Sequence, residues 1–372
     1  MLKQNPTVKL MVLCLTIALI TVTLTACGTQ QAKTNAGGSA AETRTIVDQA
    51  GRSVTVPVKI NKVFSTSPVG MIMMYSLAPE KLVGWNYELT PDNKKYILPK
   101  YQNLPNLGGW YANTSCNTEE LLKIHPDVII SIGDLSATTI SQAENIQNQT
   151  GIPVVAVNNE LTKIDQTFEF LGDLLGEKDR AGELAAYCRQ SVNDVAEKAK
   201  QIPQEKRVRV YYAEGSTGLE TDPKGSQHTQ VLDFVGGVNV ADVPMKGGMG
   251  LSTVSLEQIL AWDPDVILTW TMAGDEAAVY RIVTTDPKWA KLKASKDGRV
   301  YEIPNSPFNW FDRPPSSNRI IGVKWLANLL YPDIFKYDIK AEMKDFYAKF
   351  YHYNLTDQEV EAILARAGGK PK

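Results

Sequence analysis

The sequence predicts an α/β protein of two lobes joined by one long α-helix. Three observations favour this fold class. A segment near residue 120 recurs in the second half of the chain, strand-like apolar runs alternate with helical stretches in both halves, and one long amphipathic stretch separates the halves. The length of 372 residues suits two domains of ordinary size.

The repeat is the most specific of these observations. Residues 118–130 read TEELLKIHPDVII and residues 256–268 read LEQILAWDPDVIL, with six of thirteen aligned positions identical. Each copy predicts a short helix, a Pro-Asp turn and a strand. The runs DVIISI and DVILTW are typical of parallel strands covered on both faces. Two copies indicate two similar α/β lobes rather than a solenoid.

The remaining elements follow from apolar runs and from turn residues. In the first lobe we expect strands at 62–65, 81–85, 127–132 and 154–157, and helices at 69–77, 117–124, 138–149 and 163–175. In the second lobe we expect strands at 208–213, 265–269 and 299–303, and helices at 226–235, 255–261, 273–284, 316–330 and 341–351.

One long helix is predicted between the lobes. Ala181, Leu184, Ala185 and Cys188 begin a series of apolar residues at spacings of three and four, and no proline occurs before Pro203. A helix of about 24 residues would be about 36 Å long and would act as a stiff connector with a small closure motion. The predicted boundaries are therefore a first lobe at 44–177, a linking helix at 178–203 and a second lobe at 204–372.

The N-terminal residues have the layout of an export signal. Lys3 and Lys9 precede an apolar run too short for a spanning helix, and the run ends in Leu24-Thr25-Ala26-Cys27. This ending resembles the lipobox of bacterial lipoproteins, which implies removal of the signal peptide 1–26 and acylation of Cys27. Residues 27–43 contain no large apolar side chain beyond the modified cysteine, so we expect a flexible tether. The alternative is an uncleaved N-terminal helix.

Composition and motifs exclude several classes of protein. With 39 basic and 41 acidic residues, the formal charge of -2 disfavours general nucleic-acid binding. The only strongly apolar stretch is N-terminal, so we do not expect a polytopic transporter. No nucleotide-binding, zinc-protease or serine-hydrolase motif is present, so we expect no enzyme and no cofactor. Cys116 and Cys188 are expected to be free thiols.

The order and spacing of several segments resemble the substrate-binding proteins of ABC importers that have a single helical linker, a group that binds ferric siderophores, heme and cobalamin. These segments are the two repeats, RTIVDQAGRSVTVP at 44–57, VFSTSP at 63–68, GGVNVAD at 236–242 and FDRPPSSNRIIGVKWL at 311–326. The resemblance implies two Rossmann-like lobes with a ligand cleft between them. It also implies an extracytoplasmic, lipid-anchored monomer that delivers its cargo to a permease dimer and its ATPase.

The resemblance also implies that one glutamate from each lobe docks onto the permease. The matching positions are Glu119 and Glu257, which occupy equivalent places in the two repeats. Equivalent acids on similar lobes offer two charges to a symmetric dimer, and such exposed pairs set orientation more than affinity. The alternative is that each is an ordinary first-turn acid favoured by the helix dipole.

Aromatic residues are frequent at the expected carboxyl ends of strands and in loops, where ligands meet α/β sheets. They bring large apolar area and would suit a bulky or macrocyclic guest, although most aromatics belong to the core. The candidates for lining the cleft are Trp85, Tyr87, Trp110, Tyr111, Tyr212, Trp270, Trp310 and Phe311.

The polar candidates for ligand binding surround Arg313. Its guanidinium could bind carboxylate, catecholate or phosphate, unless it forms a structural salt bridge with Asp312. Ser67 lies at a strand-to-helix turn of the other lobe, and a polar loop supplies Glu220, Thr221 and His228. Three scattered histidines do not form the cage of a free-metal receptor, so we expect no ion bound directly by the protein. His228 is the candidate if one exists.

The sequence ranks the cargo as a ferric siderophore or a similar iron complex first, a corrinoid second and a nickel chelate third, with heme also compatible with an aromatic cleft. Two readings of other classes remain: a lipid-anchored metal-complex reductase or metallochaperone, and a receptor that presents its ligand to a sensor.

Overall fold

The computed structural model describes residues 42–245, 251–271 and 277–368, which belong to one compact unit, Glu42–Lys372. The predicted signal peptide, Cys27 and nearly all of the predicted tether lie outside the described residues. The tether was expected to extend to residue 43, but Thr43 already starts the first strand, β1. Within the described residues, no helix is both long and apolar enough to span a bilayer.

The first lobe is built on a three-stranded parallel sheet. Its order is β3-β4-β5, with Val63 opposite Val128 and Ile129 opposite Val154. A hairpin of β1 (Thr43–Val47) and β2 (Ser53–Pro57) precedes this sheet. The other elements are β3 (Val63–Ser65), α2 (Pro68–Leu77), α3 (Pro91–Lys95), α4 (Thr118–Ile124), β4 (Val128–Gly133), α5 (Ala137–Thr150), β5 (Val154–Asn158) and α6 (Ile164–Leu175).

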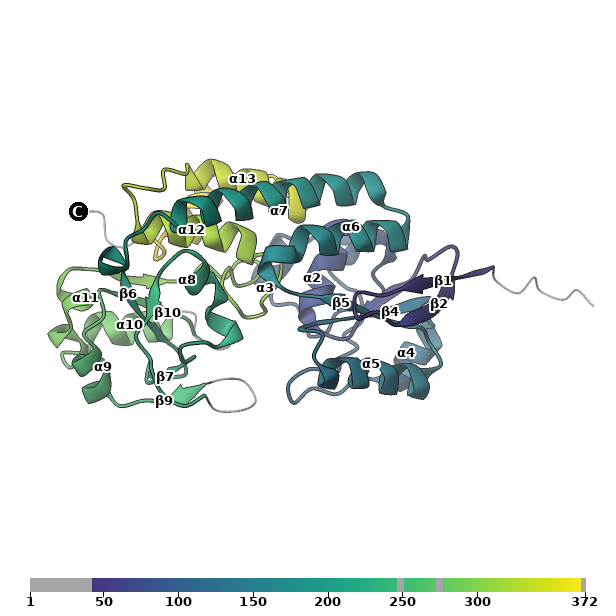
Figure 1. Cartoon of the computed structure of the whole chain (residues 1–372), viewed down its shortest axis with the longest axis horizontal. Coiled ribbons are helices and arrows are strands. Elements are labelled where there is room, and N and C mark those ends of the chain that lie inside the picture. The colour runs from purple at the N-terminus through teal and green to yellow at the C-terminus, as the bar shows by residue number, and fades with distance from the viewer. Residues whose placement is uncertain (1–41, 246–250, 272–276, 369–372) are drawn as a thin grey trace, which may run out of the picture. The chain divides into compact units, whose positions relative to one another are not determined.

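The second lobe has its own four-stranded parallel sheet, ordered β11-β10-β6-β8, and a short antiparallel pair, β7-β9. The predicted α/β fold of two lobes is thereby confirmed (Figure 1). Its elements are β6 (Arg209–Ala213), β7 (Glu220–Thr221), α8 (Gln230–Phe234), β8 (Val238–Asn239), β9 (Ser252–Thr253), α9 (Leu256–Trp262), β10 (Val266–Thr269), α10 (Ala278–Thr285), α11 (Lys293–Lys296), β11 (Val300–Glu302), α12 (Arg319–Leu330), α13 (Ile339–Phe350) and α14 (Asp357–Leu364).

The predicted linking helix is one unbroken helix, α7 (Lys178–Ala199), of 22 residues. Leu184, Cys188 and Val192 lie on its buried face, as the apolar spacing predicts. In Figure 1, α7 runs beside α6 of the first lobe and α12 of the second, and both contacts are extensive. The C-terminal helix α13 also contacts α2 of the first lobe, and Tyr75 Oη donates to the Tyr351 carbonyl at 3.3 Å. The lobes are therefore joined by more than the linker.

The two repeats fold alike. Helices α4 and α9 both have seven residues and end at a residue in the left-handed region, His125 with φ 52° and Asp263 with φ 43°. The aspartate of each Pro-Asp turn accepts a backbone N–H from the neighbouring strand region: Asp127 from Lys62 at 2.9 Å and Asp265 from Arg209 at 3.0 Å. The repeated aspartate thus fixes the start of a buried strand against its neighbour in both lobes.

One predicted strand is wrong. Residues 81–85 form no strand, because Pro79–Lys81 is a 3₁₀ turn and the chain then makes only isolated bridges, Val63 with Leu82 and Trp85 with Asn106. The apolar pattern there reflects burial against the sheet edge rather than strand pairing. The sequence also missed the hairpin β1-β2, whose alternating pattern of exposed and more buried residues is that of a strand with one face covered. Cys116 and Cys188 are both free, as expected.

We expect Gly322→Ala to destabilise the fold. An alanine Cβ would lie 1.8 Å from the Trp310 carbonyl oxygen, where α12 packs on the loop after β11. Overpacking of this kind costs about 1–3 kcal/mol. Gly182→Ala in α7 is the matched control, because its Cβ would meet nothing within 4 Å, and it should stabilise the helix by about 0.5–1 kcal/mol. Urea unfolding of both variants checks this, and equal effects would contradict the packing.

Candidate functional site

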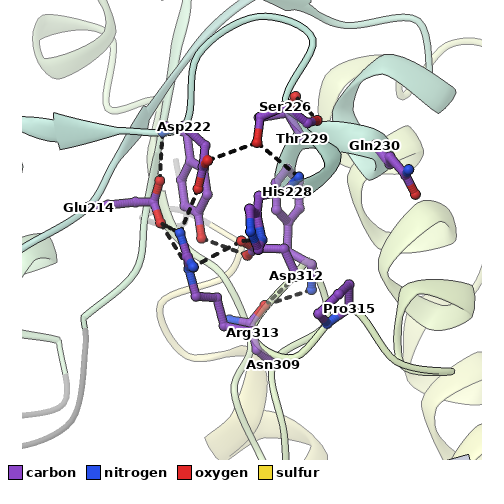
Figure 2. Close-up of polar contacts among 12 residues, drawn as sticks. Glu214, Asp222, Ser226, His228, Thr229, Gln230, Asn309, Asp312, Arg313 and Pro315 are labelled. Carbon is purple, nitrogen blue, oxygen red and sulfur yellow. Dashed lines mark hydrogen bonds and ion pairs between the residues drawn. The ribbon is translucent and has the colours of Figure 1, made fainter. Parts of the chain in front are cut away.

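A cluster of charged side chains lies in the second lobe, after the parallel strand β6, after the short strand β7 and in the loop between β11 and α12. Glu214 follows β6, Asp222 follows β7, and Asp312 and Arg313 lie in the loop between β11 and α12. His228 lies on a 3₁₀ turn, Gln227–Thr229, capped by Ser226. The carboxyl ends of parallel strands meet at one sheet edge, which is where α/β proteins bind ligands. Figure 2 shows these five side chains converging, and we call them the carboxylate cluster.

Arg313 is the centre of the carboxylate cluster. Its Nη2 donates to Glu214 Oε1 at 2.8 Å and to Asp222 Oδ2 at 2.5 Å, and its Nε lies 3.3 Å from Asp312 Oδ2. The guanidinium also lies 5.2 Å from the centre of the Trp270 ring. The predicted alternative, a salt bridge with Asp312, is therefore present and is extended by two further carboxylates.

His228 and Asp312 face each other beside Arg313. His228 Nδ1 lies 3.2 Å from Asp312 Oδ2, yet neither atom makes a hydrogen bond. The other Asp312 oxygen, Oδ1, accepts from the Tyr212 hydroxyl at 2.8 Å. Asp222 Oδ1 accepts from Ser226 Oγ at 2.8 Å. The carboxylates are thus held in place by hydroxyl donors, while Asp312 Oδ2 has ion-pair contacts but no hydrogen bond and the facing His228 Nδ1 has none either.

Burial and mutual repulsion shift the ionisation of the carboxylate cluster. Burial, followed by the charge of Asp312, raises the pKa of Glu214 well above its usual range, and Arg313 acts in the opposite direction. Burial also raises the pKa of Asp222, opposed by His228 and Arg313. Burial lowers the pKa of Arg313, but the surrounding acids outweigh that effect and raise it overall. The guanidinium therefore stays charged, and protons can be taken up at the carboxylates.

A cavity of about 210 Å³ is lined by residues of both lobes, among them Gln227, the sequence neighbour of His228, and Pro315, two positions after Arg313. Residues after β4 and β5 line one side, and residues of α8, its preceding turn and α12 line the other. The lining consists of Gly133, Asp134, Asn158, Asn159 and Glu160 from the first lobe and Gln227, Gln230, Pro315 and Arg319 from the second. Most of these side chains are polar, so the cavity suits a small polar ligand.

Arg319 is a buried cation at this cavity. It donates to Asn159 O at 2.6 Å, to Asn159 Oδ1 at 3.0 Å and to Gln230 Oε1 at 2.7 Å. Within the described part of the chain, no carboxylate lies within ion-pair distance of its guanidinium. Burial lowers the pKa of Arg319 to about 10, and Asp312 opposes this shift. Arg319 was not predicted as a site residue. The sequence does carry a signal for it, because an arginine begins a helix whose other residues are mostly apolar.

The aromatic cleft predicted from the sequence is largely wrong. Trp85 is 1% exposed and its indole donates to the Tyr101 carbonyl, while Trp310 is 0% exposed and packs on Trp325. Phe311 is also buried and stacks near Tyr212, with ring centres 5.1 Å apart. These rings fill the lobe cores because loops that fold back on a sheet bury large apolar area there.

Some of the other predicted ligand-binding residues lie at the carboxylate cluster, and the rest neither belong to the cluster nor line the cavity. Tyr212, His228 and Arg313 meet in the carboxylate cluster, and Trp270 lies against Arg313. Tyr87, Trp110 and Tyr111 are half-buried in the first lobe and do not line the cavity, and neither do Glu220 and Thr221 of β7. Ser67 caps α2, and its hydroxyl is buried without a hydrogen bond. Glu214, Asp222 and Asn159 are site residues that the sequence did not reveal.

The two predicted docking glutamates occupy equivalent positions. Glu119 and Glu257 are each the second residue of a seven-residue helix, α4 and α9, and both are exposed. Each projects from the same place in one of two similar lobes.

Comparison with known proteins gives consistent matches. Residues 82–307 match a family model described as periplasmic binding protein. Molybdate-binding protein MolA of Haemophilus influenzae is 29% identical, over 84% of this chain and 92% of that protein. The Fe(3+)-citrate-binding protein YfmC of Bacillus subtilis is 24% identical, over 79% and 91%. An ABC transporter solute binding protein from Sulfurospirillum deleyianum, of known structure, is 32% identical with a TM-score of 0.80, over 87% and 99%.

We expect Arg313→Met to destabilise the protein by about 3–5 kcal/mol at pH 7.5, because three buried carboxylates lose their cation. The loss should be smaller near pH 5. Without the guanidinium, the raised pKa values of Glu214 and Asp222 rise further, so the folded state holds protons that the unfolded state releases above pH ~4, and stability falls as pH rises.

Thermal or urea unfolding of Arg313→Met at both pH values checks this result. Arg189→Met is the matched control, because the Arg189 side chain is 46% exposed and pairs with Asp165 at the surface. The free energy of unfolding of Arg189→Met should fall by less than about 1 kcal/mol at either pH. Similar losses in the two variants would contradict the buried network.

Proposed function

Because this chain belongs to the periplasmic binding protein family, whose members are substrate-binding components of ABC importers, we propose that it captures a compact metal complex with anionic oxygen ligands. A ferric complex of the hydroxycarboxylate or siderophore type is the first candidate. The observation that carries the proposal is the presence of two groups of opposite charge in the second lobe: the carboxylate cluster, and Arg319, which lines the cavity and has no carboxylate partner among the described residues.

The charge argument separates metal complexes from simpler ligands. A free cation would be attracted to Asp312 and its neighbours but would leave Arg319 without an anionic partner. A free anion would be attracted to Arg319 but would be repelled by the carboxylates of Glu214, Asp222 and Asp312. A metal centre surrounded by carboxylate or hydroxamate oxygens presents positive charge at its core and negative charge at its rim, so it can satisfy both sides.

The size and polarity of the cavity rank the candidates. A cavity of about 210 Å³ lies below the ~300–1,000 Å³ typical of drug-sized ligands. Heme and corrinoids need more room and apolar area, and three of the aromatic rings expected to provide that area, Trp85, Trp310 and Phe311, lie in the lobe cores. A compact ferric or nickel chelate therefore ranks above both macrocycles.

An oxyanion such as molybdate is a second candidate, favoured by Arg319 and by the similarity to a molybdate-binding protein. The three carboxylates nearby oppose a free dianion unless they take up protons, and the raised pKa values of Glu214 and Asp222 ease that uptake. A reductase or metallochaperone role is the alternative of another class. Turnover of a purified ferric chelate would support it, whereas a receptor only binds.

Delivery of the ligand to the permease would depend on residues that do not line the cavity. We place Glu119 and Glu257 at the contacts with the two permease subunits, because their helices are equivalent and their side chains are exposed. We place the mature protein outside the cytoplasm, held at the membrane by an acylated Cys27.

Arg319→Gln should weaken binding of ferric citrate by about ten-fold or more, since a charged hydrogen bond contributes about 1.5–3 kcal/mol. Titration calorimetry against ferric citrate, a ferric hydroxamate, molybdate, cyanocobalamin and hemin measures this and identifies the cargo class. Arg52→Gln is the control, because Arg52 is a half-buried arginine that pairs with Asp48 in the first lobe, outside the cavity. Tightest binding of a macrocycle, or an unchanged affinity in Arg319→Gln, would refute the compact-complex proposal.

Reversing both docking charges with Glu119→Lys and Glu257→Lys should abolish uptake in cells while leaving ligand affinity unchanged. The matched control reverses two exposed acids of α7, Glu183→Lys and Glu197→Lys, with the same change in net charge. Radiolabelled iron uptake and calorimetry measure the two effects separately. Loss of ligand binding in the first pair, or equal loss of uptake in both pairs, would show that the glutamates do not dock the permease.

A further inference from the structure

We propose that Asp222, His228 and Asp312 ligate the metal of the cargo directly. The carboxylate cluster then contains an open metal site with three protein ligands, rather than a surface that recognises only the chelator. This inference rests on the proposed function for the identity of its cargo. It reverses the expectation from sequence that the protein binds no metal ion directly.

The geometry is that of a ligand set. One donor atom from each of the three residues lies within 4.8 Å of the others. His228 Nδ1 and Asp312 Oδ2 are 3.2 Å apart. Metal–nitrogen and metal–oxygen bonds of about 2.0–2.2 Å place two donors on one ion about 3.0–3.4 Å apart. The His228–Asp312 separation therefore fits two donors on one ion, and the Asp222 donor, within 4.8 Å of both, would complete the set by a small side-chain movement.

Unsatisfied polar atoms give an independent reason. The Asp312 side chain is 1% exposed, and its Oδ2 accepts no hydrogen bond. His228 Nδ1, which faces it, is also without a hydrogen bond. Buried polar atoms are nearly always hydrogen-bonded. Asp312 Oδ2 has an ion-pair contact with Arg313 Nε at 3.3 Å but no hydrogen bond, and among the described residues His228 Nδ1 has only this carboxylate oxygen within ion-pair distance. A metal ion would satisfy both atoms at once (Figure 2).

The charges around these atoms favour a cation. Glu214, Asp222 and Asp312 supply three carboxylates against the single guanidinium of Arg313, which leaves two formal negative charges when His228 is neutral and the acids are ionised. A metal ligand imidazole is neutral, and a divalent centre would balance the cluster.

Outer-shell contacts already orient the ligands. Tyr212 Oη donates to Asp312 Oδ1 and Ser226 Oγ donates to Asp222 Oδ1, both at 2.8 Å. Such partners fix the direction of metal-binding carboxylates. Three protein donors leave positions on the metal open, and the adjoining cavity and Arg319 would accept the anionic groups that fill those positions. Imidazole and carboxylate donors suit Fe(III), Ni(II) and Co(II).

The test uses the mature protein with two probes, Co²⁺ alone and ferric citrate. His228→Gln and Asp312→Asn are the test variants, and the partly exposed His228 offers a substitution with little risk to folding. His125→Asn and Asp233→Asn are the matched controls, since His125 caps α4 and Asp233 lies on α8 outside the carboxylate cluster. Calorimetry gives affinities, and visible absorption of Co²⁺ reports imidazole and carboxylate coordination.

We expect Co²⁺ to bind with one-to-one stoichiometry, and both test variants to weaken binding by more than about 100-fold while the controls do not, because even outer-shell changes cost about 10–100-fold. Ferric citrate should lose affinity in the same variants. If ferric citrate binds equally to all four variants, the inference is wrong and the proposed function stands. If neither probe binds the parent protein, while molybdate or a macrocycle does, the inference and the proposed function are both wrong.

Discussion

The ion network around Arg313 is the interaction on which the site depends. Three acids in a buried region would be prohibitive without a cation, because desolvation penalises each charge and each acid repels the others. The guanidinium offsets these costs by donating to Glu214 and Asp222 from two other segments of the second lobe and by lying 3.3 Å from the carboxylate of its neighbour Asp312. In doing so it fixes the loop before α12 against the ends of β6 and β7. The positions of His228 and Tyr212 follow from that anchoring.

The surrounding fold keeps this network at a cavity between the lobes. The rigid α7 packs on both α6 and α12, and α13 reaches back to α2, so the two sheets are held by helices from either end of the chain. Arg319 adds a polar link across the cavity through Asn159. The two lobes are therefore joined by packed helices as well as by this polar link.

The candidate site combines groups of opposite charge. A carboxylate-rich edge with unsatisfied oxygen and nitrogen atoms lies beside a buried guanidinium bonded only to neutral acceptors. Within a family whose relatives include proteins named for molybdate and for ferric citrate, cargo class is therefore decided by how charge is distributed over a few side chains rather than by the fold.

The sequence by itself determined the two-lobe α/β fold, the equivalent helices that carry Glu119 and Glu257, and the long helix α7, because periodic burial and capping act over a few neighbouring residues. It also offered His228, from a polar loop, and Arg313, from a loop between aromatic residues and two prolines, as candidates for ligand binding. Only the tertiary structure decided that Trp85 and Trp310 enter the core, and that Glu214 meets Arg313 from 99 positions away. Strand order and loop packing bring such distant groups together, and no local pattern encodes either one.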